Sequence, residues 1–185
     1  MRLDLPQTYL IGLSCLLLVI AILVGRQLYK TRKDEISLIK LEKTIAESSQ
    51  DAGVMYELAT VQLRKRLYPQ AISTLKNALT KLESEPTEAR ALIENALGFA
   101  LAAQDDFKLA IIHYKKALKA KSDYPVALNN LAFANQKLME ETEAYTIYQE
   151  VLKIDPKNKT ANEQIRKIKI RSNSNSKKVI GKKGF

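Results

Sequence analysis

The sequence predicts an all-α protein in which a solenoid of helix pairs follows one membrane-spanning helix. Three observations support this prediction: an uncharged N-terminal run, an apolar pattern that repeats every 34 residues, and a basic C-terminal segment. We divide the 185 residues into an anchor with its basic flank (1–33), a juxtamembrane helix or half-repeat (34–51), a repeat domain with a capping helix (52–171) and a basic tail (172–185). The tail is rich in Ser, Asn and Lys, so we expect it to be disordered.

The anchor is predicted by the uncharged run from Leu5 to Gly25, which is 21 residues long. At ~1.5 Å per residue, a helix of this length covers about 31 Å, close to the roughly 30 Å hydrocarbon core of a bilayer. A cleaved signal peptide would have a shorter apolar region and a small-x-small cleavage site. This run ends instead in Leu-Val-Gly before Arg26. We therefore expect an anchor that is not cleaved.

The charges beside the run predict its orientation. Four basic residues follow the run closely, whereas Arg2 in front of it is offset by Asp4. The positive-inside rule then keeps the rest of the chain on the side of synthesis, which is the cytoplasm or the stroma of a plastid. The only cysteine, Cys15, lies in the anchor, so no disulfide can form within the chain.

The repeat is clearest in two segments that are 34 residues apart. Residues 110–118 (AIIHYKKAL) align with residues 144–152 (AYTIYQEVL), and an earlier copy at residues 71–79 (AISTLKNAL) has an offset of 39. A second apolar stripe precedes each segment, with a Leu and a small residue in equivalent places (Leu58-Ala59, Leu97-Gly98 and Leu131-Ala132). Spacings of three and four residues put each stripe on one helix face. Each copy is therefore predicted to be a pair of closely packed helices.

This pattern resembles the tetratricopeptide repeat, in which copies of 34 residues have small residues between the paired helices and often end in Pro. The resemblance covers residues 52–158, and Pro156 matches the Pro of the third copy. Glu94 departs from the pattern at a position that is usually large and apolar, and Gln62 and Asn135 replace a usual aromatic or Leu. An ordinary helical bundle need not keep a fixed period. The resemblance implies a curved solenoid that presents a concave surface to another protein.

Helical segments flank the array. Residues 37–45 (SLIKLEKTI) lie one period before Ala71, and they form either a half-repeat that covers the first pair or a plain juxtamembrane helix. Residues 161–171 predict a capping helix with Ile165 and Ile168 toward the last repeat and basic residues toward water. A polar outer face is what keeps a terminal repeat soluble.

The net charge is concentrated at the C-terminus. Residues 157–185 contain ten basic residues and one acid, and therefore carry +9 of the formal +10. Such a segment can lie on anionic lipid, touch an acidic partner or remain solvated. Nucleic-acid binding would instead require basic residues on a folded face, often with interleaved aromatic residues. We therefore expect no nucleic-acid partner.

Residues suited to catalysis or metal binding are scarce. The chain has one His and one Cys, so neither an ordinary zinc site nor a Cys–His pair is expected. Its six glycines form no phosphate-binding loop. We therefore expect no enzyme activity, no cofactor and no metal.

The register predicts a partner-binding face. In tetratricopeptide proteins the first helix of each pair lines the groove, and this resemblance selects Tyr56, Asn95, Phe99, Asn129, Phe133 and Lys137. Asn can hold the backbone amides of a ligand and Phe offers apolar contact, although Phe99 and Phe133 could instead fill space between helices. The Lys and Arg pattern of chaperone-tail clamps is missing, because Tyr56, Thr60 and Val126 occupy those positions. A receptor for carboxylate tails is therefore disfavoured.

One N-terminal span, three repeats and a basic tail resemble the small thylakoid-anchored tetratricopeptide family of cyanobacteria and red-lineage plastids that assists photosystem I assembly. The resemblance rests on architecture, size and the repeats that carry Asn and Phe. It implies a membrane-tethered scaffold that binds photosystem I subunits or assembly intermediates at the stromal or cytoplasmic face of the thylakoid. The alternative is a membrane-bound receptor or chaperone docking platform for protein targeting, which would bind soluble clients.

Overall fold

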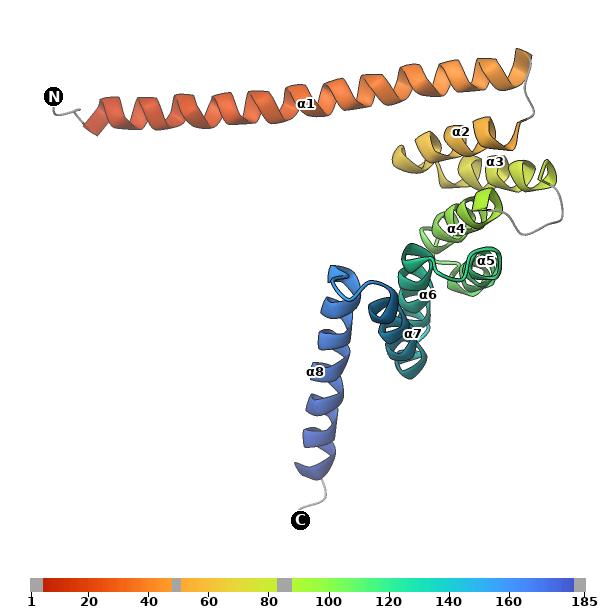
Figure 1. Cartoon of the computed structure of the whole chain (residues 1–185). Coiled ribbons are helices and arrows are strands. Elements are labelled where there is room, and N and C mark those ends of the chain that lie inside the picture. Colours follow the sequence, from red (N-terminus) through yellow and green to blue (C-terminus); the bar gives the residue numbers. More distant parts are fainter. Residues whose placement is uncertain (1–4, 48–50, 83–87, 182–185) are drawn as a thin grey trace.

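The computed structural model describes residues 5–47, 51–82 and 88–181, and within these ranges the chain forms eight helices and no strand. The all-α prediction is confirmed. The helices are α1 (Leu5–Glu47), α2 (Ala52–Arg64), α3 (Tyr68–Thr80), α4 (Glu88–Ala102), α5 (Phe107–Ala120), α6 (Pro125–Lys137), α7 (Glu141–Ile154) and α8 (Lys159–Gly181). Helices α2–α7 form a curved stack; the N-terminal half of α1 extends away from one end of it, and α8 packs on the other end and runs roughly at a right angle to α1 (Figure 1).

The turn inside each helix pair has the same backbone conformation. Arg66, Asp105 and Met139 occupy equivalent places in the three copies and have φ values of 60°, 60° and 64°. The N–H of the following residue donates a hydrogen bond of 2.9 to 3.0 Å to a carbonyl of the first helix in every copy. This is the bond that closes a helix at a left-handed residue. The repeat is therefore visible in the backbone as well as in the apolar pattern.

Small residues let the two helices of a pair touch. A Cβ atom added to Gly98 on α4 would lie 2.6 Å from Cε1 of Tyr114 and 3.1 Å from the carbonyl oxygen of Ala110, both on α5. Tyr114 is fully enclosed, and burial raises the pKa of its phenol. Tyr148 holds the equivalent place on α7, where burial raises its pKa to about 12 and its hydroxyl donates to Oε1 of Gln136 at 3.0 Å. Both phenols therefore remain neutral parts of the core.

Helix α1 continues without a break from the apolar run to the segment that packs on the solenoid. Every side chain from Thr8 to Lys33 is exposed, and α1 is the one helix of the described chain that is long and apolar enough to cross a membrane. Further along, Leu38, Leu41 and Ile45 are partly buried on one face, and Ile45 packs against the core. This is the stripe predicted as a half-repeat or a juxtamembrane helix, and it lies against α2.

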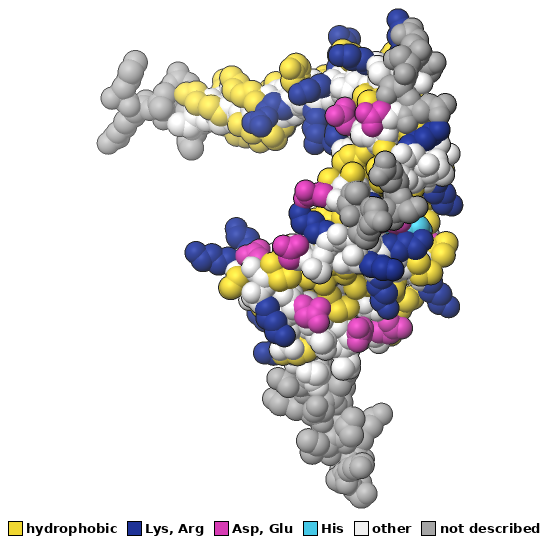
Figure 2. Space-filling model, turned by 45° about the vertical axis from the view of Figure 1, so that its right-hand side comes forward, with side chains coloured by type: hydrophobic (Ala, Val, Ile, Leu, Met, Phe, Trp, Pro, Cys, Tyr) yellow, Lys and Arg dark blue, Asp and Glu magenta, His cyan; other side chains and the backbone are white. Residues whose placement is uncertain are grey.

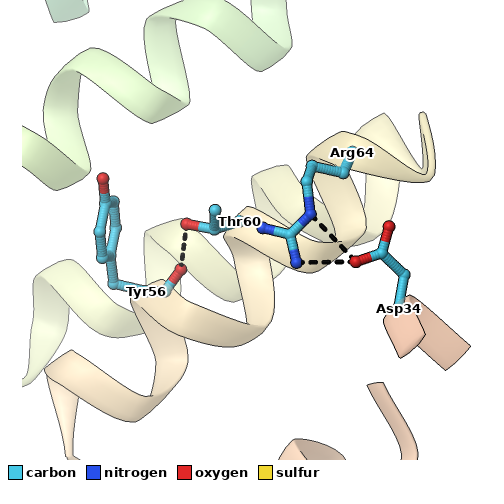
Figure 3. A network of polar contacts seen from close by, with 4 residues as sticks. All are labelled: Asp34, Tyr56, Thr60 and Arg64. Atoms are coloured by element: carbon cyan, nitrogen blue, oxygen red, sulfur yellow. Dashed lines mark hydrogen bonds and ion pairs between the residues drawn. The ribbon is translucent and has the colours of Figure 1, made fainter. Parts of the chain in front are cut away.

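Two ion pairs add to this contact. Nη2 of Arg64 lies 3.0 Å from Oδ1 of Asp34 (Figure 3). Nζ of Lys65 lies 3.4 Å from Oε1 of Glu35. Exposed pairs of this kind contribute only about 0–1 kcal/mol each, so the apolar stripe supplies most of the attachment. The ion pairs fix the position of α1 along α2, because each one joins a particular residue of α1 to a particular residue at the end of α2. The solenoid therefore keeps a defined direction relative to the apolar run.

Helix α8 covers the far end of the stack. Ala161 and Ile168 are buried against the last pair and Ile165 packs beside them, as the sequence predicts. The N–H of Ala161 donates to Oδ1 of Asn158 at 3.0 Å, which caps the first turn. The helix continues to Gly181, past Arg171, where the sequence predicts that the cap ends and a tail begins. Ser and Asn weaken a helix without interrupting it as Pro would.

The offset of 39 between the first and second copies leaves extra residues between them, around 83–87. These positions lie outside the described residues, and so do the last four residues of the predicted tail.

The close contact at Gly98 predicts the effect of one added methyl group. Gly98→Ala should lower the free energy of unfolding by roughly 1 to 3 kcal/mol, because Cβ would overlap the Tyr114 ring. Gly53→Ala is the matched control, since a Cβ there meets nothing closer than 3.5 Å and Ala favours a helix by up to about 1 kcal/mol. Thermal unfolding of the full chain in detergent, followed by circular dichroism, compares them. Equal melting of the Gly98 variant and the wild type would contradict the contact.

A buried polar pair gives a second test of the α4–α5 interface. Glu94 is 3% exposed, and its Oε2 lies 2.6 Å from Nδ1 of His113. His113→Ala should cost roughly 1 to 3 kcal/mol, because the carboxyl group would be left buried without a partner. The double variant Glu94→Leu, His113→Leu should regain most of that loss, since no unpaired polar group remains. Single and double variants that melt alike would show that the pair is not what stabilises this interface.

Candidate partner-binding groove

A groove with a volume of about 310 Å³ lies where α4, α5 and α6 meet. The rings of Phe99, Phe107 and Phe133 line it together with small Ala residues, and Asp105 and Lys137 supply charges. Ligand pockets for small molecules usually have volumes of about 300 to 1,000 Å³, so this groove is at the lower limit. It can receive one or two side chains of a peptide segment.

The aromatic rings in the groove are open to solvent. Phe99 is 46% exposed and Phe133 is 44% exposed, so neither ring is enclosed in the core. Phe107 packs its edge against Phe133, with ring centroids 6.4 Å apart and an angle of 72° between the planes. Edge-to-face pairs of this kind are favourable and keep both rings in place. The groove therefore offers a preformed apolar surface.

Lys137 adds a cation beside this surface. Its Nζ lies 5.3 Å from the ring centroid of Phe133 and 5.9 Å from that of Phe107. A cation over two rings is held by attraction to their electron-rich faces, by about 0.5 to 1 kcal/mol at an exposed site. The groove can thus pair an apolar side chain with a neighbouring acid of a ligand.

Asn95 and Asn129 join consecutive helix pairs. Nδ2 of Asn95 donates to the hydroxyl of Tyr124 at 3.4 Å, and Nδ2 of Asn129 donates to Oδ1 of Asn158 at 3.2 Å. The two bonds span the same sequence separation, so they form a repeated motif. Asn130 donates to Oδ1 of Asn95 at 3.0 Å, which uses the Asn95 acceptor within the chain. Oδ1 of Asn129 is buried without a hydrogen-bond partner among the described residues.

The six predicted residues are therefore placed differently. Phe99, Phe133 and Lys137 line one groove, while the two Asn residues form bonds at the junctions between pairs. Tyr56 does not line this groove. Its ring packs against the core, and its carbonyl oxygen accepts the hydroxyl of Thr60 at 2.8 Å (Figure 3).

Sequence reasoning missed two features of this region. Phe107 belongs to the second helix of its pair, whereas the sequence predicts a groove lined by first helices alone. A signal for Phe107 was present in the sequence, because an aromatic residue directly follows a residue that can cap a helix. That residue is Asp106, whose carboxylate accepts the N–H of Leu109 at 3.1 Å and caps α5. The pairing of Glu94 with His113 was also missed, although an acid at a core position calls for a polar partner. Within the described ranges, no three His, Cys, Asp or Glu residues gather where they could hold a metal ion.

Comparison with known proteins places this geometry in a family. No family model matches the chain. It is 32% identical over 161 residues to the protein "Uncharacterized protein ycf37" of Guillardia theta, covering 87% of this chain and 90% of that protein. It is 33% identical over 157 residues to the ycf37 protein of Cyanophora paradoxa, covering 85% and 91%. It is 32% identical over 160 residues to the chloroplastic tetratricopeptide repeat protein PYG7 of Arabidopsis thaliana, covering 86% of this chain and 53% of PYG7.

Solved structures agree on the fold. The Cut9–Hcn1 complex gives a TM-score of 0.69 at 20% identity and covers 79% of this chain and 29% of the matched chain. MamA gives a TM-score of 0.66 at 18% identity and covers 81% and 79%. At these identities the likeness shows the fold alone, and it confirms the predicted tetratricopeptide solenoid. The chain belongs to the ycf37 family of tetratricopeptide-repeat proteins.

Proposed function

We propose that this protein is a membrane-tethered scaffold that assists the assembly or stability of photosystem I at the stromal or cytoplasmic face of the thylakoid. The observation that carries the proposal is the open aromatic groove on a tetratricopeptide solenoid that is held to an exposed apolar helix. Tetratricopeptide folds act as protein-binding scaffolds, and a chloroplastic relative supports a plastid setting. The role in photosystem I assembly is supported by the resemblance in architecture.

The tether is supported by the exposed surface of α1. Eleven Leu, Ile or Val residues lie between Leu10 and Val24, and no part of the described chain covers them. Their transfer into a bilayer is favourable by roughly 3 to 7 kcal/mol in total. An apolar surface of this extent in water would promote aggregation. Insertion into a membrane accounts for both the length and the composition of the run.

Tethering suits a groove of this size. A site that receives one or two side chains binds weakly, because most of its contact energy offsets lost freedom of motion. Confinement to the same membrane raises the effective concentration of the partner without any new contact. The groove can therefore act on membrane-bound partners while releasing them once assembly is complete.

The groove favours a particular peptide chemistry. An apolar or aromatic side chain would fill the space between Phe99 and Phe133, and an acidic neighbour would meet Lys137. A chaperone docking platform has less support, because the positions of the carboxylate clamp hold Tyr56, Thr60 and Val126.

The tether predicts a clear fractionation result. Alkaline carbonate should leave the protein in the membrane pellet, because the 21-residue run holds it in the hydrocarbon core. Protease added to the stromal or cytoplasmic side should remove the solenoid. Release by carbonate would overturn the anchor, and protection from that protease would overturn its orientation.

The groove predicts a loss of partner capture without a loss of fold. The double variant Phe99→Ala, Phe133→Ala should capture photosystem I subunits from solubilised membranes about thirtyfold less well, as expected for hot-spot aromatics worth about 2 kcal/mol. Its melting should change little, since both rings are nearly half exposed. The tagged full chain serves as bait, and mass spectrometry quantifies the captured subunits.

A matched control separates the groove from surface hydrophobicity in general. Leu109 and Ile112 on α5 are 45% and 48% exposed, so the double variant Leu109→Ala, Ile112→Ala removes a similar apolar surface outside the groove. Its capture should equal that of the wild type. If the Phe variant melts far below the control, the rings belong to the core. If it folds and captures normally, the partner binds elsewhere.

A further inference from the structure

The direction of the solenoid relative to α1 has a consequence for α8. The contact of α1 with α2 holds the stack to the C-terminal end of α1, and the stack then curves back. Helix α8 consequently runs across the direction of α1 and lies level with its middle (Figure 1). One face of α8 packs on α7, and α7 lies farther from the N-terminal end of α1 than α8 does. The other face of α8 therefore points toward the N-terminal end of α1.

Near the middle of α1 the side chains change from apolar to basic. The apolar run ends at Gly25, and Arg26, Lys30 and Lys33 follow. In an inserted α1 this transition marks the surface of the bilayer, where basic side chains lie among the headgroups. Helix α8 is therefore brought to the level of the membrane surface and runs along it.

The outward face of α8 has the composition that such a surface requires. Lys159, Arg166 and Ile170 share one exposed stripe, opposite the buried Ala161 and Ile168. Ile170 is 59% exposed, although it lies in a strongly basic segment. In Figure 2, Lys and Arg side chains project to the left from the lower part of the molecule. The N-terminal half of α1 extends to the same side.

Three cations of α8 have no acid close to them among the described side chains. Lys167 lies 2.6 Å from Glu163, and Arg171 lies 2.8 Å from Glu141. Among the described side chains, Lys159, Arg166 and Lys169 have no acid within ion-pair distance, and Nζ of Lys169 lies 5.9 Å from the ring centroid of Tyr145. Their charge is therefore available to anionic headgroups.

We propose that α8 is a second membrane contact, which lies on anionic lipid of the bilayer that holds α1. Lys159, Arg166 and Lys169 reach the headgroups, and Ile170 enters the interface. The inference rests on the proposed tether. Each basic residue near an anionic surface strengthens the contact about fivefold, and salt weakens it.

Site-specific quenching in nanodiscs tests the proposal on the full chain. One fluorophore is placed on the native Cys15, or on Ile170→Cys or Ile112→Cys in a Cys15→Ser background. Cys15 is the only cysteine and reports the anchor, while Ile112 is an exposed Ile on α5, which lies outside α8. Spin-labelled lipids quench the fluorophore, either at the acyl chain or at the headgroup.

The expected pattern differs at each site. The acyl-chain label should quench the probe at Cys15. In nanodiscs with anionic lipid, the headgroup label should quench the probe at Ile170 severalfold more than the probe at Ile112. The charge reversal Lys159→Glu, Arg166→Glu, Lys169→Glu should remove that difference, and so should neutral lipid or high salt.

The possible failures are distinguishable. If Cys15 is quenched and the probe at Ile170 behaves like the probe at Ile112, the contact of α8 is overturned while the anchor stands. If Cys15 is not quenched, the tether fails and the contact of α8 fails with it. If charge reversal leaves the quenching at Ile170 unchanged, anionic lipid is not the partner. If it leaves quenching unchanged but abolishes capture of photosystem I subunits, the face of α8 binds an acidic protein instead.

Discussion

The close approach of the two helices in each pair is the constraint on which the rest of the structure depends. Gly98 allows the Tyr114 ring to lie where any Cβ would overlap it. That contact fixes the rotation of α4, and the next residue along the helix, about 100° further round, is Phe99. A side chain that cannot face the partner helix must face the groove or solvent. The open aromatic surface is therefore a geometric result of the packing inside the pair.

The second constraint is the continuity of α1. A flexible linker would let the solenoid point in any direction, whereas one helix from Leu5 to Glu47 that packs on α2 fixes the direction of the apolar run relative to the stack. With the apolar run inserted in a bilayer, as we propose, the curvature of the stack decides which elements return toward it. In that arrangement α8 takes its position relative to the membrane from these two features. A weak site can act when its orientation and its concentration are both set in advance.

Sequence reasoning reached the fold because periodicity reports which face of a helix is buried. Leu97, Ala110 and Ala117 were placed in the packed stripes, and all three are buried. Periodicity marks Glu94 as an acid at a core position, but it does not report what lies opposite, so it could not identify His113 as the hydrogen-bond partner. The same limit applies to Phe107, because a residue at the start of a second helix enters the groove only through the tertiary turn. The bonds of Asn95 likewise depend on the neighbouring pair.

The central claim is that the aromatic groove receives membrane-bound partners. Photo-crosslinking from the full chain in native membranes tests it most directly, with benzoylphenylalanine in place of Phe133 and, as the reference, in place of Ile112. The account predicts crosslinks to photosystem I subunits or assembly intermediates from position 133 and none from position 112. Crosslinks from position 133 to soluble chaperones alone, or equal products from both positions, would contradict it.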